Sequence, residues 1–208
     1  MTMHKRFHSG SVLVVDDDPG IRRMVRRLLI EEGYEVLEAA SGVEAITLLD
    51  SYEDEVRLVL LDLALPGMDG VGVMRHLVNV HHVLVGVIII TGYSELLSRE
   101  DFFALGTDTV LTSDYIMKPF SSAQLVAEVE KAFDAVERKR KAQQKAAEDR
   151  IHTRLENIES VVMSIHGNQR GFLGELGMEI VKVLVVAAAL LLLLYFGVDD
   201  FSRKLLQK

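Results

Sequence analysis

The stretch SVLVVDDDPG, residues 11–20, joins an apolar run directly to three aspartates and then to a proline. The run at 11–15 is typical of a strand that is buried on both faces. Asp18 followed by Pro19 is typical of the first turn of a helix, with Asp18 as the N-cap. The stretch therefore predicts a strand that ends in carboxylates and leads at once into a helix.

The same alternation of apolar runs and amphipathic stretches continues to about residue 120. The apolar runs lie at residues 11–15, 34–39, 57–61, 83–90 and 114–118. Continuous apolar strands that alternate with helices are typical of a parallel sheet covered on both faces. We therefore expect an α/β fold with a doubly wound, five-stranded parallel sheet, whose site lies at the carboxyl ends of the strands.

Charged and hydroxyl side chains stand at those strand ends. Asp16 and Asp17 follow the first run, Asp62 the third and Thr91 the fourth, and Lys118 is the last residue of the fifth. Clustered carboxylates repel one another unless a cation lies among them, and their oxygens are ligands that Mg²⁺ prefers. A hydroxyl, an ammonium and a metal around one carboxylate can stabilise the charge of a transferring phosphoryl group.

An alternative interpretation is that residues 16–18 only cap a helix, as any acidic triplet can. Three further motifs in fixed order favour the phosphoryl site instead: LLDLALPGMDG at 60–70, IIITGYS at 88–94 and MKPF at 117–120. With these motifs, residues 10–136 resemble the receiver domain of response regulators in bacterial two-component signalling, a flavodoxin-like fold.

The resemblance implies a role for each matching residue. Asp62 is the phosphoacceptor, Thr91 contacts a phosphoryl oxygen, and Lys118 pairs with Asp62 or with its phosphoryl group. Asp17 binds Mg²⁺ directly together with Asp62.

In the same family pattern, Asp16 acts on Mg²⁺ through water and the backbone carbonyl of Ala64 is a further ligand. Tyr115 matches an aromatic switch residue. The partner is a histidine kinase or a phosphotransfer protein, and the only catalysis expected is self-catalysed phosphoryl transfer and dephosphorylation, so the chain is not an enzyme in the ordinary sense.

Two local features qualify this match. Pro66 and Gly67 predict a tight turn beside the acceptor in which Gly67 adopts a positive φ. The stretch TDTVLTSD, residues 107–114, is longer than the family's usual turn into the last strand, so we expect an insertion beside the signalling face.

Beyond residue 121 the sequence is helical in pattern. The basic run RKRK, residues 138–141, is a starting point for a nucleic-acid hypothesis, but on a charged helix such a run is more often a solvated face. A heptad-like seam follows, formed by Ile151, Leu155, Ile158, Val162 and Ile165. This seam predicts a coiled coil, most simply a homodimer through residues 151–165.

Residues 180–198 are almost wholly apolar, with Lys182 as their one charge. As a helix they would be about 28 Å long, enough to cross a hydrocarbon core of about 30 Å. We therefore expect a single-pass protein of the cell inner membrane with its receiver facing the cytoplasm. The glycines between 167 and 177 allow either a hinge or close helix contact.

The expected division is a flexible tail at 1–9, the receiver at 10–136, a charged helical linker with coiled coil at 137–179, a transmembrane helix at 180–198 and a short tail at 199–208. The net charge of −8 argues against a nucleic-acid partner, and the absence of cysteine excludes disulfides and thiolate zinc sites.

The preferred interpretation is a membrane-tethered, phosphorylation-switched receiver whose output is a protein contact. The alternatives are a DNA-binding response regulator with an unrecognised output region and a non-signalling membrane-anchored scaffold. A metal-dependent phosphohydrolase of similar build is disfavoured, because Ala64 stands where such an enzyme would carry its general acid.

Overall fold

The computed structural model describes residues 10–80, 83–93 and 96–168. The chain divides into two compact units, Met1–Gln144 and Lys145–Lys208. The first unit contains a five-stranded sheet in the order β2-β1-β3-β4-β5, in which every neighbouring pair is parallel. The predicted doubly wound α/β fold is therefore confirmed.

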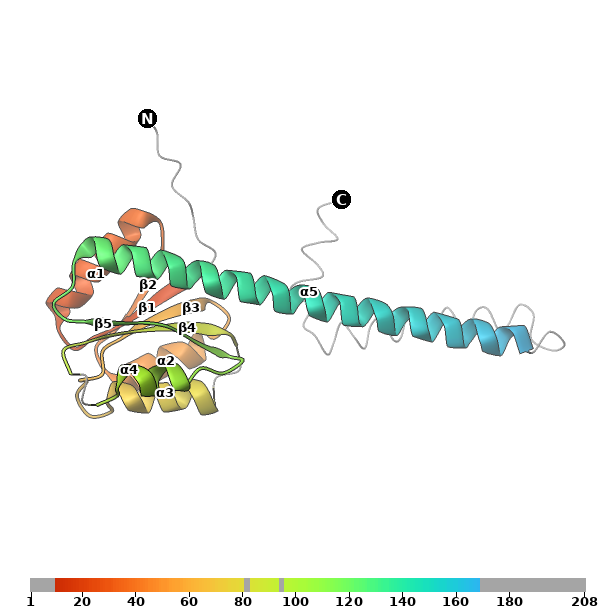
Figure 1. The fold of residues 1–208 in the computed structure, drawn as a ribbon, viewed down its shortest axis with the longest axis horizontal. Coiled ribbons are helices and arrows are strands. Elements are labelled where there is room, and N and C mark those ends of the chain that lie inside the picture. Colours follow the sequence, from red (N-terminus) through yellow and green to blue (C-terminus); the bar gives the residue numbers. More distant parts are fainter. Residues whose placement is uncertain (1–9, 81–82, 94–95, 169–208) are drawn as a thin grey trace, which may run out of the picture. The chain divides into compact units, whose positions relative to one another are not determined.

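The strands and helices alternate along the chain (Figure 1). The strands are β1 (Ser11–Val15), β2 (Glu35–Ala39), β3 (Val56–Leu61), β4 (Val85–Thr91) and β5 (Val110–Met117). The helices are α1 (Pro19–Glu32), α2 (Gly42–Ser51), α3 (Gly70–Asn79), α4 (Arg99–Ala104) and α5 (Ser122–Asn168).

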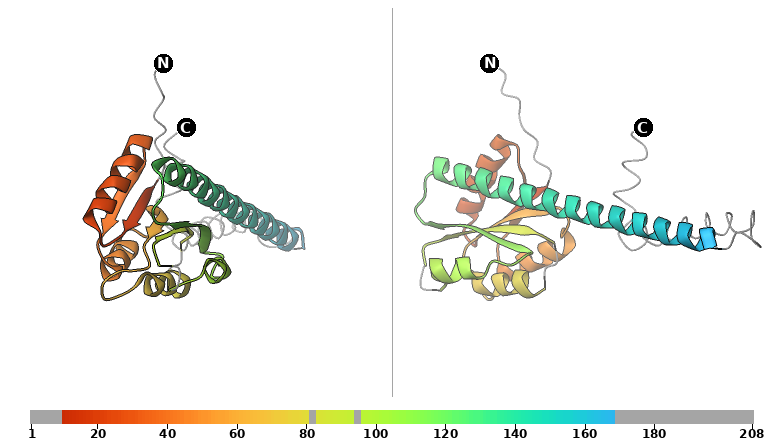
Figure 2. Two further views of the ribbon diagram at one scale, coloured as in Figure 1. Left: turned by 60° about the vertical axis from the view of Figure 1, so that its left-hand side comes forward. Right: turned by 45° about the vertical axis from the view of Figure 1, so that its right-hand side comes forward.

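Helices α1 and α5 cover one face of the sheet, and α2, α3 and α4 cover the other (Figure 2). Because successive side chains of a strand point to opposite faces, each strand contributes to both cores. Val12 and Val14 pack with α1 and α5, whereas Leu13 and Val15 pack with the opposite layer. Helices thus cover both faces of the sheet, so a site is expected at the ends of the strands.

The expected start of the first helix is confirmed, and α2 begins with a cap of the same kind. The side chain of Asp18 accepts hydrogen bonds from the N–H groups of Gly20 (2.6 Å) and Ile21 (3.3 Å), and Pro19 occupies the first helical position. The Ser41 hydroxyl accepts from the N–H of Glu44 at the start of α2.

The expectation of an insertion over residues 107–114 needs correction. Strand β5 begins at Val110 and pairs with β4 along its whole length. The register shifts between Val87, opposite Thr112, and Ile88, opposite Asp114, so Ser113 is the extra residue of a β-bulge. The sequence pattern missed the first half of this strand because β5 is an edge strand whose residues 111–114 are only partly buried.

The residues before Val110 form a closed turn. The Thr107 hydroxyl accepts from the N–H of Val110 at 2.9 Å, and the N–H of Thr107 donates to the Val110 carbonyl at 2.9 Å. Residues 107–114 thus form this turn and the first part of the edge strand β5.

Helix α5 continues without interruption through the charged region and includes Gly167. In its second half Ile151 and Leu155 are partly exposed and Ile158 is exposed, while the side chains of Val162 and Ile165 lie outside the described residues. Within the part of the chain that the structure describes, no helix is long and apolar enough to cross a membrane. The expected tails at 1–9 and 199–208 and the expected span at 180–198 also lie outside the described residues.

The start of α3 packs directly on the backbone at the end of β3. A Cβ at Gly70 would stand 2.3 Å from the Asp62 carbonyl oxygen and 2.7 Å from the Leu63 Cα. A Cβ at Gly72, two residues later, would meet the flexible side chain of Met68 at 2.9 Å. The loop of residues 62–69 between β3 and α3, called the acceptor loop below, can therefore lie against α3 only if residue 70 is a glycine.

We predict that Gly70→Ala lowers the free energy of unfolding by about 1–3 kcal/mol, because overpacking against backbone cannot relax by a rotamer change. Gly72→Ala is the matched control and should be neutral or stabilising, since alanine favours a helix interior by up to about 1 kcal/mol over glycine. Urea unfolding followed by circular dichroism measures both. Equal stability of the two variants would contradict the packing at Gly70.

Candidate functional site

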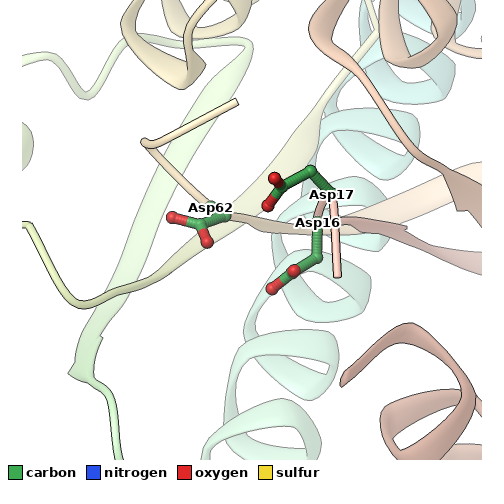
Figure 3. Close-up of side chains that lie close together, drawn as sticks. All are labelled: Asp16, Asp17 and Asp62. Atoms are coloured by element: carbon green, nitrogen blue, oxygen red, sulfur yellow. The ribbon is translucent and has the colours of Figure 1, made fainter. Parts of the chain in front are cut away.

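Three aspartates meet at the carboxyl ends of two neighbouring strands (Figure 3). Asp16 and Asp17 follow β1, and Asp62 follows β3, which is paired with β1. One carboxylate oxygen from each of the three lies within 4.8 Å of the others. Asp16 and Asp62 are buried and Asp17 is exposed, so the cluster is partly open to solvent at the carboxyl ends of the strands.

Lys118 joins the two buried carboxylates. Its Nζ donates to Asp16 Oδ2 at 2.6 Å and to Asp62 Oδ2 at 2.5 Å. The backbone places the lysine, because its N–H donates to the Thr91 carbonyl at 2.9 Å and so ties the end of β5 to the end of β4. Residues that are 102 and 56 positions apart in the chain thus form one charge cluster.

Burial and the neighbouring groups shift the pKa of Lys118 and of Asp16. Burial lowers the pKa of the Lys118 ammonium, but the hydrogen bonds and charges of Asp16 and Asp62 outweigh burial and raise it overall. Burial raises the pKa of Asp16, and the hydrogen bond from Lys118 offsets this only in part. The lysine therefore stays protonated and is held as a fixed positive charge between the two carboxylates.

Backbone groups hold the remaining carboxylate oxygens. The N–H of Ala64 donates to Asp62 Oδ1 at 3.0 Å, and the N–H of Asp18 donates to Asp16 Oδ1 at 2.9 Å. Each buried carboxylate thus has one oxygen on the backbone and the other on the ammonium. This arrangement fixes the orientation of the Asp62 carboxylate before any ligand binds.

The turn that follows Asp62 has the predicted form. Gly67 has a φ of +75°, as expected from the Pro66–Gly67 pair. The turn leads to Asp69, which caps α3 by accepting from the N–H of Gly72 at 2.8 Å. The acceptor loop is therefore closed between β3 and α3.

Thr91 is fully buried at the end of β4, where its hydroxyl oxygen accepts from the N–H of Tyr93 at 3.1 Å. A Cβ at the following residue, Gly92, would meet no atom within 4 Å. Gly92 therefore faces open space just after β4, at the same edge of the sheet as the carboxylates, while the Thr91 hydroxyl itself is buried.

Tyr115 points inward. It is 5% exposed, its hydroxyl donates to the Leu97 carbonyl at 2.8 Å, and its ring packs edge-on against Phe102. Arg99, which sequence reasoning missed, donates to the Tyr115 carbonyl at 3.0 Å and pairs with Asp114 at 3.2 Å. A lone arginine on a short helix carries no signal for such a contact, because the contact depends on how α4 lies against β5.

The donor set fits a hard divalent cation. Three carboxylates within 4.8 Å offer only oxygen ligands, and one of them, Asp17, is exposed and accessible from solvent. Mg²⁺ prefers oxygen ligands and retains several waters, which suits an open site with few protein ligands. The predicted residues Asp16, Asp17 and Asp62 are thus brought together as a magnesium site requires.

A comparison with known families identifies this arrangement. The model of the response regulator receiver domain matches residues 12–130, more than half of the chain. The chain belongs to the response regulator receiver family. Receivers accept phosphoryl groups from histidine kinases and bind Mg²⁺ at an acidic pocket, which here corresponds to Asp16, Asp17 and Asp62.

Individual relatives agree with this assignment. The transcriptional regulatory protein SrrA of Staphylococcus aureus is 38% identical over 121 residues, which are 58% of this chain and 46% of SrrA. The chain therefore spans about half the length of that relative.

Solved structures show the same fold. The CheY-like receiver protein of Methanospirillum hungatei is 30% identical with a TM-score of 0.52, over 62% of this chain and 98% of that one. The signal receiver domain of a LuxO repressor from Vibrio parahaemolyticus has a TM-score of 0.56 over 64% of this chain and 96% of that one. At 22% identity the latter shows the fold alone.

The receiver's charge cluster makes a direct prediction for metal binding. Lys118→Met removes the positive charge that partly neutralises Asp16 and Asp62, so we expect Mg²⁺ to bind several-fold more tightly. Asp17→Asn removes a ligand charge and should weaken binding by about tenfold or more. Calorimetric titration with MgCl₂ measures both.

Lys131→Met is the control, because this exposed lysine pairs with Glu128 on α5 and contacts none of the three aspartates. Its Mg²⁺ affinity should equal that of the unchanged protein. Equal affinities in Lys118→Met and Lys131→Met would contradict the role of Lys118 as the competing charge.

Proposed function

We propose that this receiver is a phosphorylation switch in which Asp62 accepts a phosphoryl group from a histidine kinase or a phosphotransfer protein. The observation that carries the proposal is the Asp62 carboxylate held between the Ala64 N–H and the Lys118 ammonium, beside Asp16 and Asp17. This geometry orients a nucleophilic oxygen and surrounds it with the charges that phosphoryl transfer requires.

In the transfer step an Asp62 carboxylate oxygen attacks phosphorus, and the bond from phosphorus to the donor nitrogen breaks. The product is an aspartyl phosphate, and the leaving imidazole retains the electron pair and takes up a proton. Mg²⁺, when bound, neutralises charge on the phosphoryl oxygens. Lys118 then exchanges its Asp62 oxygen for a phosphoryl oxygen, and the Thr91 hydroxyl donates to another.

The switch beyond the site is assigned to Thr91 and Tyr115. When the Thr91 hydroxyl moves to the phosphoryl group, the N–H of Tyr93 loses its acceptor and the β4–α4 loop rearranges. Tyr115, whose hydroxyl donates to the Leu97 carbonyl in that loop, would respond to the change and pass it to β5. The chain would then act through contacts and not as an enzyme, apart from its own phosphorylation and dephosphorylation.

We predict that acetyl phosphate with Mg²⁺ adds one phosphoryl group to the protein, and that Asp62→Asn abolishes the addition. Asp17→Asn should nearly abolish it by loss of the metal. Asp69→Asn is the matched control, since asparagine caps a helix as well as aspartate and the residue lies in the same loop. Intact-mass spectrometry measures the product. Unchanged labelling of Asp62→Asn would remove Asp62 as the acceptor.

The output is proposed to be a protein contact at the inner membrane, with the receiver in the cytoplasm. The support is the composition of residues 180–198, which carry one charge, Lys182. Tethering would raise the receiver's effective concentration beside membrane-bound kinases without new contacts. The homodimer through residues 151–165 stays a prediction of the heptad pattern.

A transcriptional output is the second candidate, because the relative SrrA is named a transcriptional regulatory protein. The match covers 46% of SrrA, so its activity as a whole is not carried over to this chain. The basic run at 138–141 gives the DNA-binding alternative little support, since two of its four side chains, Lys139 and Arg140, bond to backbone carbonyls of the receiver itself.

For the tether we predict that the full chain sediments with membranes and resists sodium carbonate and high salt, because an apolar helix satisfies its backbone within the lipid. A shortened chain, residues 1–168, should stay in the supernatant. Immunoblots of membrane and soluble fractions provide the measurement. Release of the full chain by carbonate would show that residues 180–198 do not span the bilayer.

A further inference from the structure

One turn of α5 lies against the starts of three strands. Strand β3 begins beside Glu137, the residue before β4 contacts Arg140, and the turn before β5 contacts Lys139. This turn of the helix lies at the amino ends of the strands, at the edge of the sheet opposite the phosphorylation site.

The contacts are specific. Arg57, the second residue of β3, forms an ion pair with Glu137, with Nε 3.3 Å from Oε1 but without hydrogen-bond geometry, and both side chains are largely buried. Arg140 donates to the Leu84 carbonyl at 3.2 Å, immediately before β4. Lys139 donates more weakly to the Thr107 carbonyl at 3.4 Å.

Close packing accompanies these polar contacts. Val136 is fully buried, and a Cβ at Gly86 in β4 would stand 2.7 Å from its Cγ2. Burial, followed by the charge of Arg57, lowers the pKa of Arg140, in keeping with a guanidinium that is drawn out of solvent. This part of α5 is therefore packed against the sheet and is not a solvent-exposed extension of the helix.

The same three strands carry the site at their other ends. β3 leads into Asp62, β4 ends at Thr91 and β5 leads into Lys118. With about 3.3 Å per residue, strands of six to eight residues span roughly 20–26 Å. Strands β3 and β4 are buried almost throughout, so a displacement at one end is transmitted with little loss.

We propose that Arg57, Glu137 and Arg140 form a basal clamp that couples the phosphorylation site to the part of α5 beyond residue 144. The three are positioning residues: they contact neither the site nor a ligand, and they act by holding the helix to the starts of β3 and β4. The inference rests on the proposed phosphorylation of Asp62 and adds the route by which its effect reaches the helical extension.

Within the basic run at 138–141, some side chains contact the sheet and others are exposed to solvent. Arg140 holds β4 and Lys139 assists at β5, whereas Arg138 is exposed. This division supplies a matched pair of arginines, two residues apart on one helix, of which only Arg140 should matter for coupling.

The experiment measures amide hydrogen exchange over residues 145–168 in the full chain, purified in mild detergent, with and without beryllofluoride and Mg²⁺. In the unchanged protein we expect beryllofluoride to alter exchange in this segment several-fold. Arg140→Ala and Glu137→Gln should reduce that response at least threefold, and Arg140→Lys should restore part of it through one remaining donor. Arg138→Ala should respond like the unchanged protein.

Phosphorylation of Asp62 by acetyl phosphate is measured on the same samples by intact mass and should be equal in all variants. Normal labelling with a full exchange response in Arg140→Ala and Glu137→Gln overturns the clamp, as does an equal loss in Arg138→Ala. Normal labelling of the unchanged protein without any response also overturns it. Absence of labelling in the unchanged protein refutes the proposed function instead. If Arg140→Ala does not fold, Glu137→Gln and Arg140→Lys decide the outcome.

Discussion

The ion pair of Lys118 with Asp16 and Asp62 is the interaction on which the rest of this structure depends. Two buried carboxylates that approach one ammonium this closely would repel each other without it. Removal of one partner from such a buried group typically costs about 3–5 kcal/mol, because a charge is left uncompensated. The fold must therefore place the ends of β1, β3 and β5 together, and it does so by stacking parallel strands between two apolar helix layers.

The same interaction explains how the site would switch in the proposed function. A cluster in which one positive charge serves two carboxylates holds residual negative charge, which a divalent cation can neutralise. A phosphoryl group on Asp62 would give Lys118 a new partner in place of the Asp62 oxygen. The buried Thr91 hydroxyl, bonded only to the N–H of Tyr93 among the contacts described, stands ready to follow. In the proposed coupling, small changes of partner at this edge would be carried by the buried strands β3 and β4 to the opposite end of the sheet.

Sequence reasoning succeeded where chemistry is local. Asp18 before Pro19 specifies a helix start by itself, and Pro66–Gly67 specifies a turn whose glycine has a positive φ. The cluster of Asp16, Asp62 and Lys118 was also predictable, since residues that follow parallel strands converge at one edge of the sheet.

What the sequence did not show depends on pairing across the fold. The first half of β5 was missed because an edge strand with Thr112 and a bulged Ser113 lacks an apolar pattern. The contacts of Arg99 with β5 and of Arg140 with the start of β4 leave no trace in spacing or composition. Such contacts follow from how finished elements pack, and only the three-dimensional arrangement reveals them.

The measurement that tests the account most directly is a crystal structure of the protein with beryllofluoride and Mg²⁺. The account predicts beryllium bonded to an Asp62 oxygen, Lys118 Nζ and Thr91 Oγ1 on its fluorines, and the metal beside Asp16 and Asp17. A structure in which beryllofluoride is bound elsewhere, or in which Lys118 still joins Asp16 to an unmodified Asp62 at saturating beryllofluoride, would contradict it.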